Sequence, residues 1–557
     1  MSKDEVEHLL FLVVTLSLSQ TNRYFCVMKY CKLLLLTCFV LFCSCREQQS
    51  PHIRIVCTSD VHGNLFPFDF LTGNEVEGSL ARVSSYLNEL RNEGSVVYLD
   101  NGDMLQGSPA TYCYNTHAVG KPHVAAEVLN YLRCDAVTVG NNDIEPGGAT
   151  YQRYMNELKC LSLGGNVVYE GTDEPFIPPY TLIEREGLQI AVLGLTTPVI
   201  PYLIPKCQWL ELEFEEMERS AQRWMQHLHE NATPDLVVGL FHSGYEGGLV
   251  TEAFAEHATR RVAEQVPGFD AIFYGHDHRP CVIEVVNVVG DTVVLLNPGR
   301  DARMVATLDV TVSKEGGPKF KASLESMDGY TPDPTFMSTF APHVERIFKY
   351  VNRSIGISTH EAAMNDVLAG PSPLVDFIHQ MQLDVSNATI SFAAPLENDG
   401  VLPEGEVTVG DIYRLFPYEN SLYVLWLTGR EVKNYLELSY DQWLSLPSQP
   451  QRGGYADSAS GIVYEVHASR PMGSRVEIKS MADGSPFGMD VRYMVVLNSY
   501  RALGGGGLLT QGAGITHEAL EERIVYTTTA DLRFYMINYI QMRKTITPCS
   551  LHQWRFL

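Results

Sequence analysis

Between Ile53 and about Asp309, short apolar runs alternate with segments of helical periodicity, and this alternation leaves few folds open to the chain. The apolar runs are IRIVCTSD, SVVYLDNGD, AVTVGNND, IAVLGLTTP, DLVVGLFHSG and AIFYGHDH. Between them, SLARVSSYLNELRNEG and FEEMERSAQRWMQHLHENA carry apolar residues at helical spacing. Runs of this kind are typical of strands buried on both faces of an α/β sheet. The sequence CVIEVVNVVGDTVVLLNPG predicts a β-hairpin that turns at Gly290-Asp291.

A second unit is predicted after the proline-marked segment GYTPDPTF. The sequence MSTFAPHVERIFKYVNRSIG predicts a linker helix within residues 331–356, and residues 357–545 are expected to form a separate α/β domain. The Gly-rich stretch YRALGGGGLLTQGAG of that domain is expected to lack regular structure. A chain of 557 residues is long enough for two or three domains, each with its own core.

The beginning of the chain differs in kind from the rest. Two lysines precede an apolar run from Leu33 to Phe42, and small residues then lead to Cys45, a pattern typical of a signal peptide. The segment FCSC resembles a loose lipoprotein cleavage box, so residues 1–45 are predicted to be a signal and lipoprotein segment, with Met28 as an alternative start. The mature protein would then be exported and held by a lipid on Cys45 in the periplasm or at the outer cell surface. An uncleaved anchor is the alternative, although the run is shorter than the roughly 20 residues that a membrane span needs.

Composition excludes several classes of partner. The formal net charge is −25 with a pI near 5.1 and no basic stripe, which argues against binding of polymeric nucleic acid through its phosphates. An anionic substrate would therefore need local help, for example from metal ions. The cysteines after residue 45 form an odd set without CxxC spacing, so neither a zinc knuckle nor a redox motif is predicted, although one or two disulfides remain open. We expect a monomer.

Residues of the kinds that bind metals follow five of the apolar runs. They are Asp60 and His62 after the first run, then Asp103, Asn141, His242, and the pair His276 and His278. Ligands of open α/β sheets bind at the carboxyl ends of the strands, so these side chains are expected to converge. Mixed imidazole, carboxylate and carboxamide ligands suit zinc, manganese or iron better than calcium. Seven ligands are too many for one tetrahedral ion but suit two divalent ions that share a carboxylate, for which Asp103 is the natural bridge.

The alternative for each of these positions is that the side chain has a structural role and binds no metal. A lone histidine at a strand end is more often structural than a ligand. Because such residues occur at five strand ends, a purely structural role for the whole set is improbable.

Five segments together resemble the calcineurin-like metallophosphoesterases: TSDVHGN, DNGDMLQGSP, VGNN, FHSG and YGHDH. From about residue 53 to 540 the sequence is similar to the two-domain 5'-nucleotidase and 2',3'-cyclic-nucleotide phosphodiesterase group. The resemblance implies an α/β fold (α+β overall). It has a four-layer α/β/β/α metallophosphoesterase domain over residues 53–330 and a C-terminal α/β substrate-binding domain of the 5'-nucleotidase type.

The resemblance also implies a ligand set and a reaction. Asp60, His62, Asp103 and His278 would hold one metal ion, and Asp103, Asn141, His242 and His276 would hold the other. A hydroxide activated by the two ions would attack phosphorus, which makes the protein a hydrolase of phosphate esters in nucleotide catabolism. The ions, rather than Lys or Arg, would supply the positive charge that lets an acidic protein accept an anion.

In the C-terminal domain the resemblance assigns residues to the base of a nucleotide. The segment RLFPYENSLYVLWLTG matches the family's Pro-Phe-Gly-Asn segment, which places Tyr418 at one stacking ring and Asn420 at a base-contacting amide. The segment NSYRALGGGG places Tyr500 at the second ring. Stacking on an aromatic side chain is worth about 1–3 kcal/mol per base in single-strand binders. The alternative is that both tyrosines are ordinary half-buried aromatics.

One departure from the family concerns the phosphate. The family's Asn-Gly-Gly-Gly-Ile-Arg segment stands here as SFAAPL, so Leu396 occupies the position of an Arg that helps hold the phosphate of a 5'-nucleotide. The nearby PLVDFIHQMQLD offers His379 but no Arg. The loss of this Arg therefore weakens the prediction of an activity restricted to 5'-monophosphates. The segments NYLELS and YRALGGGG favour the cyclic-phosphodiesterase branch, whose diester carries one charge fewer.

A second departure lies in AVTVGNNDIEPG, where Asn142 stands at the catalytic His of the family and Glu145 at its pairing acid. Asn donates a neutral hydrogen bond but cannot carry a proton, so slow turnover of poor leaving groups is expected. Alternatively, Asn142 only shapes the loop while another residue, with His117 and His123 as candidates, moves the proton.

Two competing functions follow. One is a catalytically weakened nucleotide-binding surface lipoprotein, prompted by Asn142. The other is a hydrolase of UDP-sugars or thiosulfate-type compounds on the same scaffold.

Overall fold

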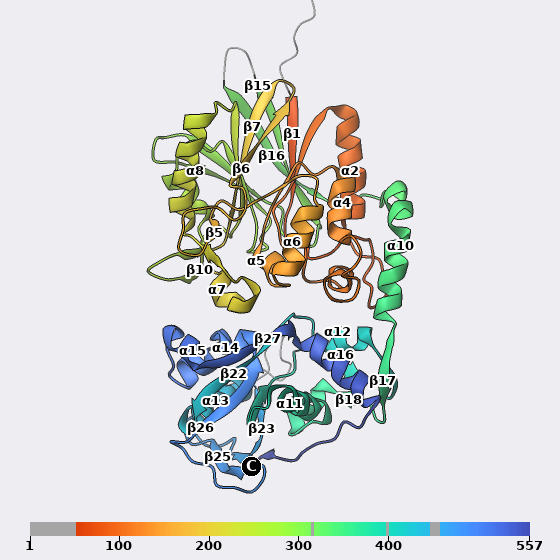
Figure 1. Cartoon of the computed structure of the whole chain (residues 1–557), viewed down its shortest axis with the longest axis vertical. Helices are drawn as coiled ribbons and strands as arrows, with labels where there is room; N and C mark the ends of the chain where they lie inside the picture. The colour runs from red at the N-terminus through yellow and green to blue at the C-terminus, as the bar shows by residue number, and fades with distance from the viewer. Residues whose placement is uncertain (1–51, 313–316, 397–399, 446–456) are drawn as a thin grey trace, which may run out of the picture. The chain divides into compact units, whose positions relative to one another are not determined.

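The computed structural model describes residues 52–312, 317–396, 400–445 and 457–557 (Figure 1). The predicted signal and lipoprotein segment, including Met28 and Cys45, lies outside the described residues. Of the helices in the described ranges, none combines the length and the apolar character needed to cross a bilayer. The described cysteines are all unpaired thiols.

The first of two six-stranded sheets has the strand order β16-β15-β1-β2-β3-β4. Its strands are β1 (His52–Thr58), β2 (Ser95–Asp100), β3 (Ala136–Thr138), β4 (Leu161–Leu163), β15 (Met304–Val312) and β16 (Pro318–Ser326). Strands β1 to β4 run parallel, whereas β15 pairs with β1 in the antiparallel sense. The parallel strands therefore have their carboxyl ends at one edge of this sheet.

The second six-stranded sheet has the order β13-β14-β12-β9-β7-β6. Its strands are β6 (Tyr180–Arg185), β7 (Leu188–Thr196), β9 (Leu236–His242), β12 (Ala271–Tyr274), β13 (Cys281–Val286) and β14 (Thr292–Asn297). Strands β7, β9, β12 and β14 are parallel. The predicted hairpin is confirmed, since β13 pairs antiparallel with β14 through a turn in which Gly290 has a φ of 94°.

Helices cover the outer faces of both sheets, and the sheets pack on each other. Helices α2 (Leu80–Glu93) and α8 (Met217–Asn231) contact β2 of the first sheet and β7 of the second, while β3 packs on β7 and β9. Further helices of this domain are α4 (Val124–Leu132), α6 (Gly148–Glu157) and α9 (Thr259–Gln265). The predicted α/β/β/α layering is confirmed.

Helix α2 shows how the sequence fixes these layers. The side chain of Ser79 accepts a hydrogen bond from the backbone N–H of Arg82 and so caps the first turn. Leu80, Val83 and Leu87 lie on one face at helical spacing and are fully buried.

Helix α10 (Pro334–Val351) links the two domains, with Asp333 as its N-cap and a proline in its first turn. It is shorter than the predicted range 331–356, because the chain turns to strand at β17 (Ser354–Ser358), which pairs with β21 (Gly405–Thr408).

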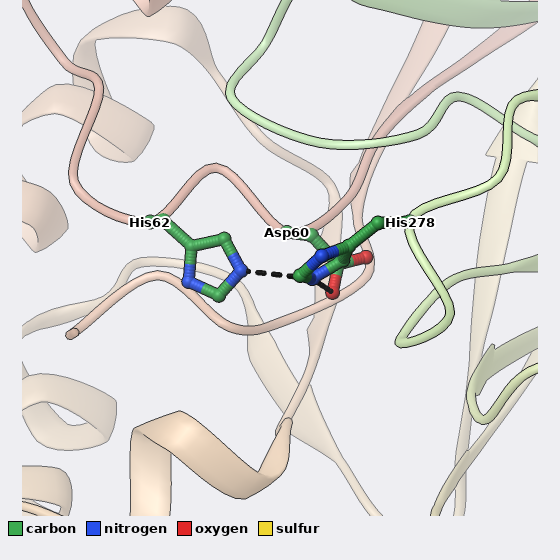
Figure 2. A group of neighbouring side chains, drawn as sticks. All are labelled: Asp60, His62 and His278. Atoms are coloured by element: carbon green, nitrogen blue, oxygen red, sulfur yellow. Dashed lines mark hydrogen bonds and ion pairs between the residues drawn. The ribbon is translucent and has the colours of Figure 1, made fainter. Parts of the chain in front are cut away.

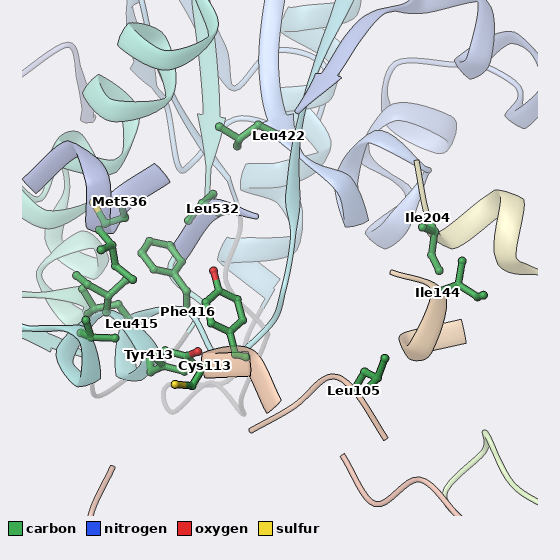
Figure 3. Packing of buried hydrophobic residues seen from close by; sticks show 14 of the residues in the cluster. Leu105, Cys113, Ile144, Ile204, Tyr413, Leu415, Phe416, Leu422, Leu532 and Met536 are labelled. Atoms are coloured by element: carbon green, nitrogen blue, oxygen red, sulfur yellow. The ribbon is translucent and has the colours of Figure 1, made fainter. Parts of the chain in front are cut away.

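The C-terminal domain is built on a five-stranded sheet of order β23-β19-β26-β22-β27. Its strands are β19 (Ile390–Ala393), β22 (Ser421–Thr428), β23 (Ser458–Ser460), β26 (Arg492–Asn498) and β27 (Ile524–Asp531). Helices α11 (Pro373–Ser386) and α13 (Gly429–Ser445) pack on this sheet. Helix α12 (Val409–Leu415) packs on α16 (Leu532–Arg543), and Figure 3 shows Leu415 close to Met536 in this core.

Two three-stranded sheets complete the domain. Strand β28 (Thr545–Ile546) joins β17, and β29 (Trp554–Phe556) joins β24 (Ile462–Val466), which also pairs with β25 (Val476–Met481). The fold thus continues beyond residue 545.

The Gly-rich stretch was expected to lack regular structure, and this prediction is wrong. It forms a series of short helical turns, namely α14 (Ser499–Ala502), η4 (Gly505–Gly507) and η5 (Leu508–Gly512). Gly504, which precedes η4, and Gly506 and Gly507 within it adopt positive φ, which lets the chain change direction without a Cβ clash.

Candidate metal centre

The predicted metal-binding residues lie at the carboxyl ends of strands from both sheets. Asp60 and His62 follow β1, Asp103 follows β2, Asn141 follows β3, His242 ends β9, and His276 and His278 follow β12. Side chains of six of them form two groups in which one ligand atom from each residue lies within 4.8 Å of the others. These groups are Asp60, His62 and His278 (Figure 2) and Asp103, His242 and His276. Asn141 is the first residue of α5 (Asn141–Ile144). The next residue, Asn142, donates a hydrogen bond from its backbone N–H to the carboxylate of Asp103.

The backbone at these positions is unusual. Five of the seven residues have positive φ: Asp60 (51°), His62 (50°), Asp103 (57°), His276 (70°) and His278 (57°). Such angles are uncommon for residues with a Cβ and cost of order 1–3 kcal/mol each. Strain concentrated on residues that share a crevice supports a functional role for the crevice.

Backbone carbonyls orient two of the histidines. His62 donates from Nδ1 to the carbonyl of Gln106 at 3.2 Å, and His242 donates from Nδ1 to the carbonyl of Asn101 at 2.7 Å. In the neutral ring, Nε2 is then left with a free lone pair. Metal-ligating histidines commonly hold their other ring nitrogen in this way.

Atoms left without partners indicate that a cation belongs here. Nε2 of His242 and Oδ1 of Asn141 are buried and have no hydrogen-bond partner, although His242 Nε2 lies 3.3 Å from Asp103 Oδ2. Nε2 of His62 faces Nε2 of His278 at 3.1 Å, so two basic nitrogens point at each other. Burial opposes a charge on His242, but the adjacent Asp103 carboxylate raises its pKa to about 10. The residues therefore fit divalent metal ions bound by nitrogen and oxygen donors.

Two glycines let the carboxylates approach. A Cβ on Gly140 would collide with Oδ1 of Asp103, and a Cβ on Gly275 would collide with Oγ of Ser59 and Oδ2 of Asp60. Neither position tolerates a side chain while the carboxylate stays where it is.

Asn142 is hydrogen-bonded to the carboxylate of Asp103, the proposed bridging ligand. Its backbone N–H donates to Oδ1 of Asp103 and its side-chain Nδ2 donates to Oδ2, both at 2.8 Å. Glu145, expected to pair with this position, instead accepts a hydrogen bond from Gln106, and burial raises its pKa well above the ordinary value. Asn142 thus orients Asp103 with a neutral amide.

Asp143 was missed by the sequence reasoning, although it stands in the same quoted loop. Its carboxylate accepts hydrogen bonds from the backbone N–H groups of Asp103, Met104, Leu105 and Gly140 at 2.8–3.0 Å. One carboxylate therefore clamps the loop after β2 to the loop after β3. Asp143 positions Asp103 without being one of the proposed ligands.

Glu256 was also missed. Its Oε1 accepts a hydrogen bond from Nε2 of His276 at 3.0 Å, which leaves Nδ1 of that ring for a metal ion. Glu256 lies on β11 (Ala255–His257), which pairs with β10 (Gly247–Val250) in a two-stranded ribbon. Glu256 could not be predicted from residue spacing in the sequence, because only the folding of the ribbon brings it next to His276.

In the C-terminal domain, the two predicted stacking residues are exposed. Tyr418 is 56% exposed and Tyr500 is 58% exposed, although both are large aromatic side chains. Ser499 Oγ donates to Asn420 Oδ1 at 3.1 Å, so the segments that carry the two tyrosines are joined. A Cβ on Gly505 would collide with the ring of Tyr500, so the Gly-rich stretch lets this ring lie against backbone.

Several residues considered from the sequence have other roles. Leu396 is half-buried and packs against the hydrophobic core. His379 is buried between Oγ of Ser391 and Oγ of Ser458, and burial lowers its pKa to about 3.

The two histidines proposed as alternative proton carriers are also engaged elsewhere. His123 caps α4, bonds Asn115, and has its pKa lowered to about 3 by burial. His117 packs its ring on Tyr350.

Comparison with known proteins agrees with this geometry. Residues 53–280 match the family model described as calcineurin-like phosphoesterase, and residues 354–512 match that of the 5'-nucleotidase C-terminal domain. A 2',3'-cyclic-nucleotide 2'-phosphodiesterase/3'-nucleotidase of Haemophilus influenzae is 24% identical over 93% of this chain and 89% of its own length. The trifunctional nucleotide phosphoesterase protein YfkN of Bacillus subtilis is 24% identical over 90% of this chain, which spans only 39% of that protein.

Among solved structures, a putative 5'-nucleotidase from Staphylococcus aureus shares the fold. Its TM-score is 0.70 at 20% identity, with 91% of this chain and 100% of that chain covered.

Proposed function

Because the chain belongs to the calcineurin-like phosphoesterases that carry a 5'-nucleotidase C-terminal domain, we propose that it hydrolyses nucleotide phosphate esters. The observation that carries the proposal is the pair of ligand groups at the carboxyl ends of β1, β2, β9 and β12, each within 4.8 Å. The unpartnered His242 Nε2 and Asn141 Oδ1 support the same centre. The metallophosphoesterase domain would span 53–330 and the nucleotide-binding domain 357–545, joined by the helix within 331–356.

The residues divide into two ligand sets. Asp60, His62 and His278 would hold one divalent ion and Asn141, His242 and His276 the other, with Asp103 shared between them. Two bound cations would lower the pKa of water to near 7 and withdraw charge from the phosphoryl oxygens.

The protein's own groups then position the reacting ester. Asp143 fixes the loop of Asp103. The backbone N–H of Asn142 holds one oxygen of the Asp103 carboxylate, and its side-chain amide holds the other. Because this amide does not ionise, position 142 cannot hand a proton to the leaving oxygen. Esters with good leaving groups are therefore expected to react faster than ribose esters.

The C-terminal domain would supply the nucleoside site. Tyr418 and Tyr500 present exposed rings for a base, and the hydrogen bond from Ser499 to Asn420 joins the segments that carry them. Leu396, at the family's Arg position, offers no charge to a terminal phosphate. A 2',3'-cyclic diester is accordingly preferred over a 5'-monophosphate as substrate.

A substrate panel with metal analysis tests the proposal. The purified protein is assayed with Mn²⁺ or Zn²⁺ on 5'-AMP, 3'-AMP, 2',3'-cyclic AMP, bis-nitrophenyl phosphate, a UDP-sugar and thiosulfate-type compounds. Release of phosphate or alcohol from the nucleotides, absent in Asp103→Ala, is expected. No turnover of any ester by protein that retains two ions overturns the enzymatic function and leaves the weakened nucleotide binder that Asn142 suggests.

The nucleoside site has its own test. Tyr500→Ala is expected to raise KM for 2',3'-cyclic AMP by about 5- to 150-fold, the equivalent of 1–3 kcal/mol, with little effect on bis-nitrophenyl phosphate. Tyr500→Phe keeps the ring and serves as the matched control. Equal KM changes for both substrates would contradict base stacking.

Export and lipid attachment at Cys45 belong to the same proposal and rest on the sequence pattern of residues 1–45. Labelling of the expressed protein with a radioactive fatty acid, compared with Cys45→Ala, checks the anchor.

A further inference from the structure

A cavity of about 440 Å³ and a larger one of about 870 Å³ lie apart from the ligand groups. The larger cavity, called the basic groove below, is lined by helix α10 and by the loop that follows η1 (Cys113–His117). Its charged lining residues are Lys121, Arg346, Lys349, Arg353 and Glu345. Four positive charges therefore stand against one negative charge, on a chain whose formal net charge is −25.

The cations of the basic groove have no carboxylate partners. Across the residues that the structure describes, no ion pair involves Lys121, Arg346, Lys349 or Arg353. Arg346 donates from Nη1 to the hydroxyl of Tyr114 at 2.7 Å, and Arg353 lies over the ring of Tyr350, 5.6 Å from its centroid. The buried Nε of Arg353 has no hydrogen-bond partner. Neutral groups thus make the direct contacts of both guanidinium groups. The nearby carboxylate of Glu127, whose pKa is raised by burial and lowered by Arg346, balances part of the charge of Arg346 without forming an ion pair with it.

Burial and the nearby cations both lower the pKa of two neighbouring histidines. The pKa of His117 is lowered by burial and by Arg353, and the pKa of His343 is lowered by burial and by Arg346. Both rings therefore favour the neutral form, and the groove keeps guanidinium and ammonium groups as its charged donors.

The cations come from two separate parts of the chain. Arg346, Lys349 and Arg353 follow each other at spacings of three and four residues, which places them on one side of α10 and its end. Lys121 approaches from the loop, where the ring of His117 packs on Tyr350 at 5.1 Å and joins loop to helix.

We propose that the basic groove is a second binding site, distinct from the metal centre, for a di- or triphosphate group. Arg recognises phosphate with a planar fork of donors, and Lys contributes a mobile point charge. Four cations exceed what one orthophosphate can contact, and the volume of about 870 Å³ is within the range of small-molecule sites. The ligand is either a free phosphorylated compound or a phosphate-bearing lipid headgroup.

Binding of methylenediphosphonate, a diphosphate that cannot be hydrolysed, tests the site by calorimetry on the metal-loaded protein. Binding of the diphosphonate at the metal centre is expected to be the same in wild type and variants. The difference in measured binding between them therefore comes from the basic groove. Arg346→Gln with Arg353→Gln is expected to remove one of two binding events, or to weaken it about 100-fold, because each charge-assisted contact is worth roughly tenfold. Lys319→Gln with Lys321→Gln removes two exposed charges elsewhere and is the matched control.

The two arginines are half-buried, so a second variant guards against misfolding. Lys121→Gln with Lys349→Gln changes two exposed residues and is expected to weaken the same binding event about tenfold or more. Wild-type flotation with vesicles that contain diacylglycerol diphosphate, lost in both double variants, identifies a lipid headgroup as the source. Loss of methylenediphosphonate binding without flotation identifies a free phosphorylated compound. Equal binding and equal flotation of wild type and both double variants overturn the proposal.

Discussion

The metal centre and the basic groove are two charged regions of opposite design. At the metal centre, carboxylates and imidazoles converge, and buried acceptors such as Asn141 Oδ1 have no hydrogen-bond partner. In the basic groove, Arg346 and Arg353 contact neutral groups directly, and positive side chains outnumber negative ones. Each region thus holds an excess of one kind of group, metal-ligating side chains in the first and cations in the second, and this excess indicates the class of ligand, a cation in one case and a phosphate in the other.

The two regions also differ in how the backbone supports them. Proposed ligands such as Asp60, Asp103 and His276 stand at positive φ at strand ends, where the sheets fix their directions. The groove cations stand on a helix, just beyond its end and on a loop, and the exposed Lys121 and Lys349 keep rotamer freedom. A strained, rigid site suits a reaction with strict geometry, whereas the groove suits binding alone.

The largest effect is expected at the shared carboxylate. Asp103→Ala should lower kcat/KM for bis-nitrophenyl phosphate on the order of 10⁴-fold, because loss of the bridge costs several kcal/mol of charge stabilisation. Metal content, measured by mass spectrometry of the purified protein, should fall below two ions. A variant with unchanged metal content and rate would remove Asp103 from the ligand set.

The Asn142→His variant tests the hypothesis that the metal centre lacks only a proton donor. The rate on 5'-AMP should rise about 10²- to 10⁴-fold, with a smaller gain on nitrophenyl esters, because general acid catalysis matters most for poor leaving groups. Asn142→Gln, which keeps the amide, is the control. An unchanged or lower rate with both ions bound would mean that Asn142 serves only to hold Asp103.

Glu256→Gln tests a positioning residue of the metal centre. Loss of the charged partner of His276 should weaken the affinity for one metal ion about 10- to 100-fold, measured by chelator competition. Glu256→Asp should restore part of it, while Glu246→Gln, at an exposed ion pair with Arg260, should change nothing. Unchanged metal affinity would show that Glu256 supports only the ribbon of β10 and β11.

The smallest effect is expected from the basic groove. Lys121→Gln with Lys349→Gln should leave kcat/KM on nitrophenyl esters within about twofold of wild type, because exposed charges outside the site contribute little to the reaction. Steady-state assays with saturating metal check this. A loss comparable to that of Asp103→Ala would mean that the groove belongs to the catalytic site.

The fold was readable from sequence because apolar periodicity reports strands and helices directly. The parallel strands and the hairpin at Gly290 follow from local pattern. The Gly-rich stretch was misjudged because glycine permits helical turns as readily as loops when neighbouring segments pack against it. The sequence reasoning also found no basic stripe, because Arg346, Lys349 and Arg353 are too few to mark one until Lys121 joins them across the groove.

The residues that end the strands can be read from apolar periodicity, and a parallel sheet brings strand ends together whatever the details of packing. The sequence therefore predicts one crevice with the residues Asp60, His62, Asp103, Asn141, His242, His276 and His278, and the structure brings the side chains of all but Asn141 into two groups. Which atoms face one another follows from the folded chain alone, as do the clamp of Asp143 on two loops and the contact of Glu256 with His276. These contacts join residues far apart in the chain, 216 positions in the case of His62 and His278, and their geometry depends on side-chain directions that no periodicity encodes.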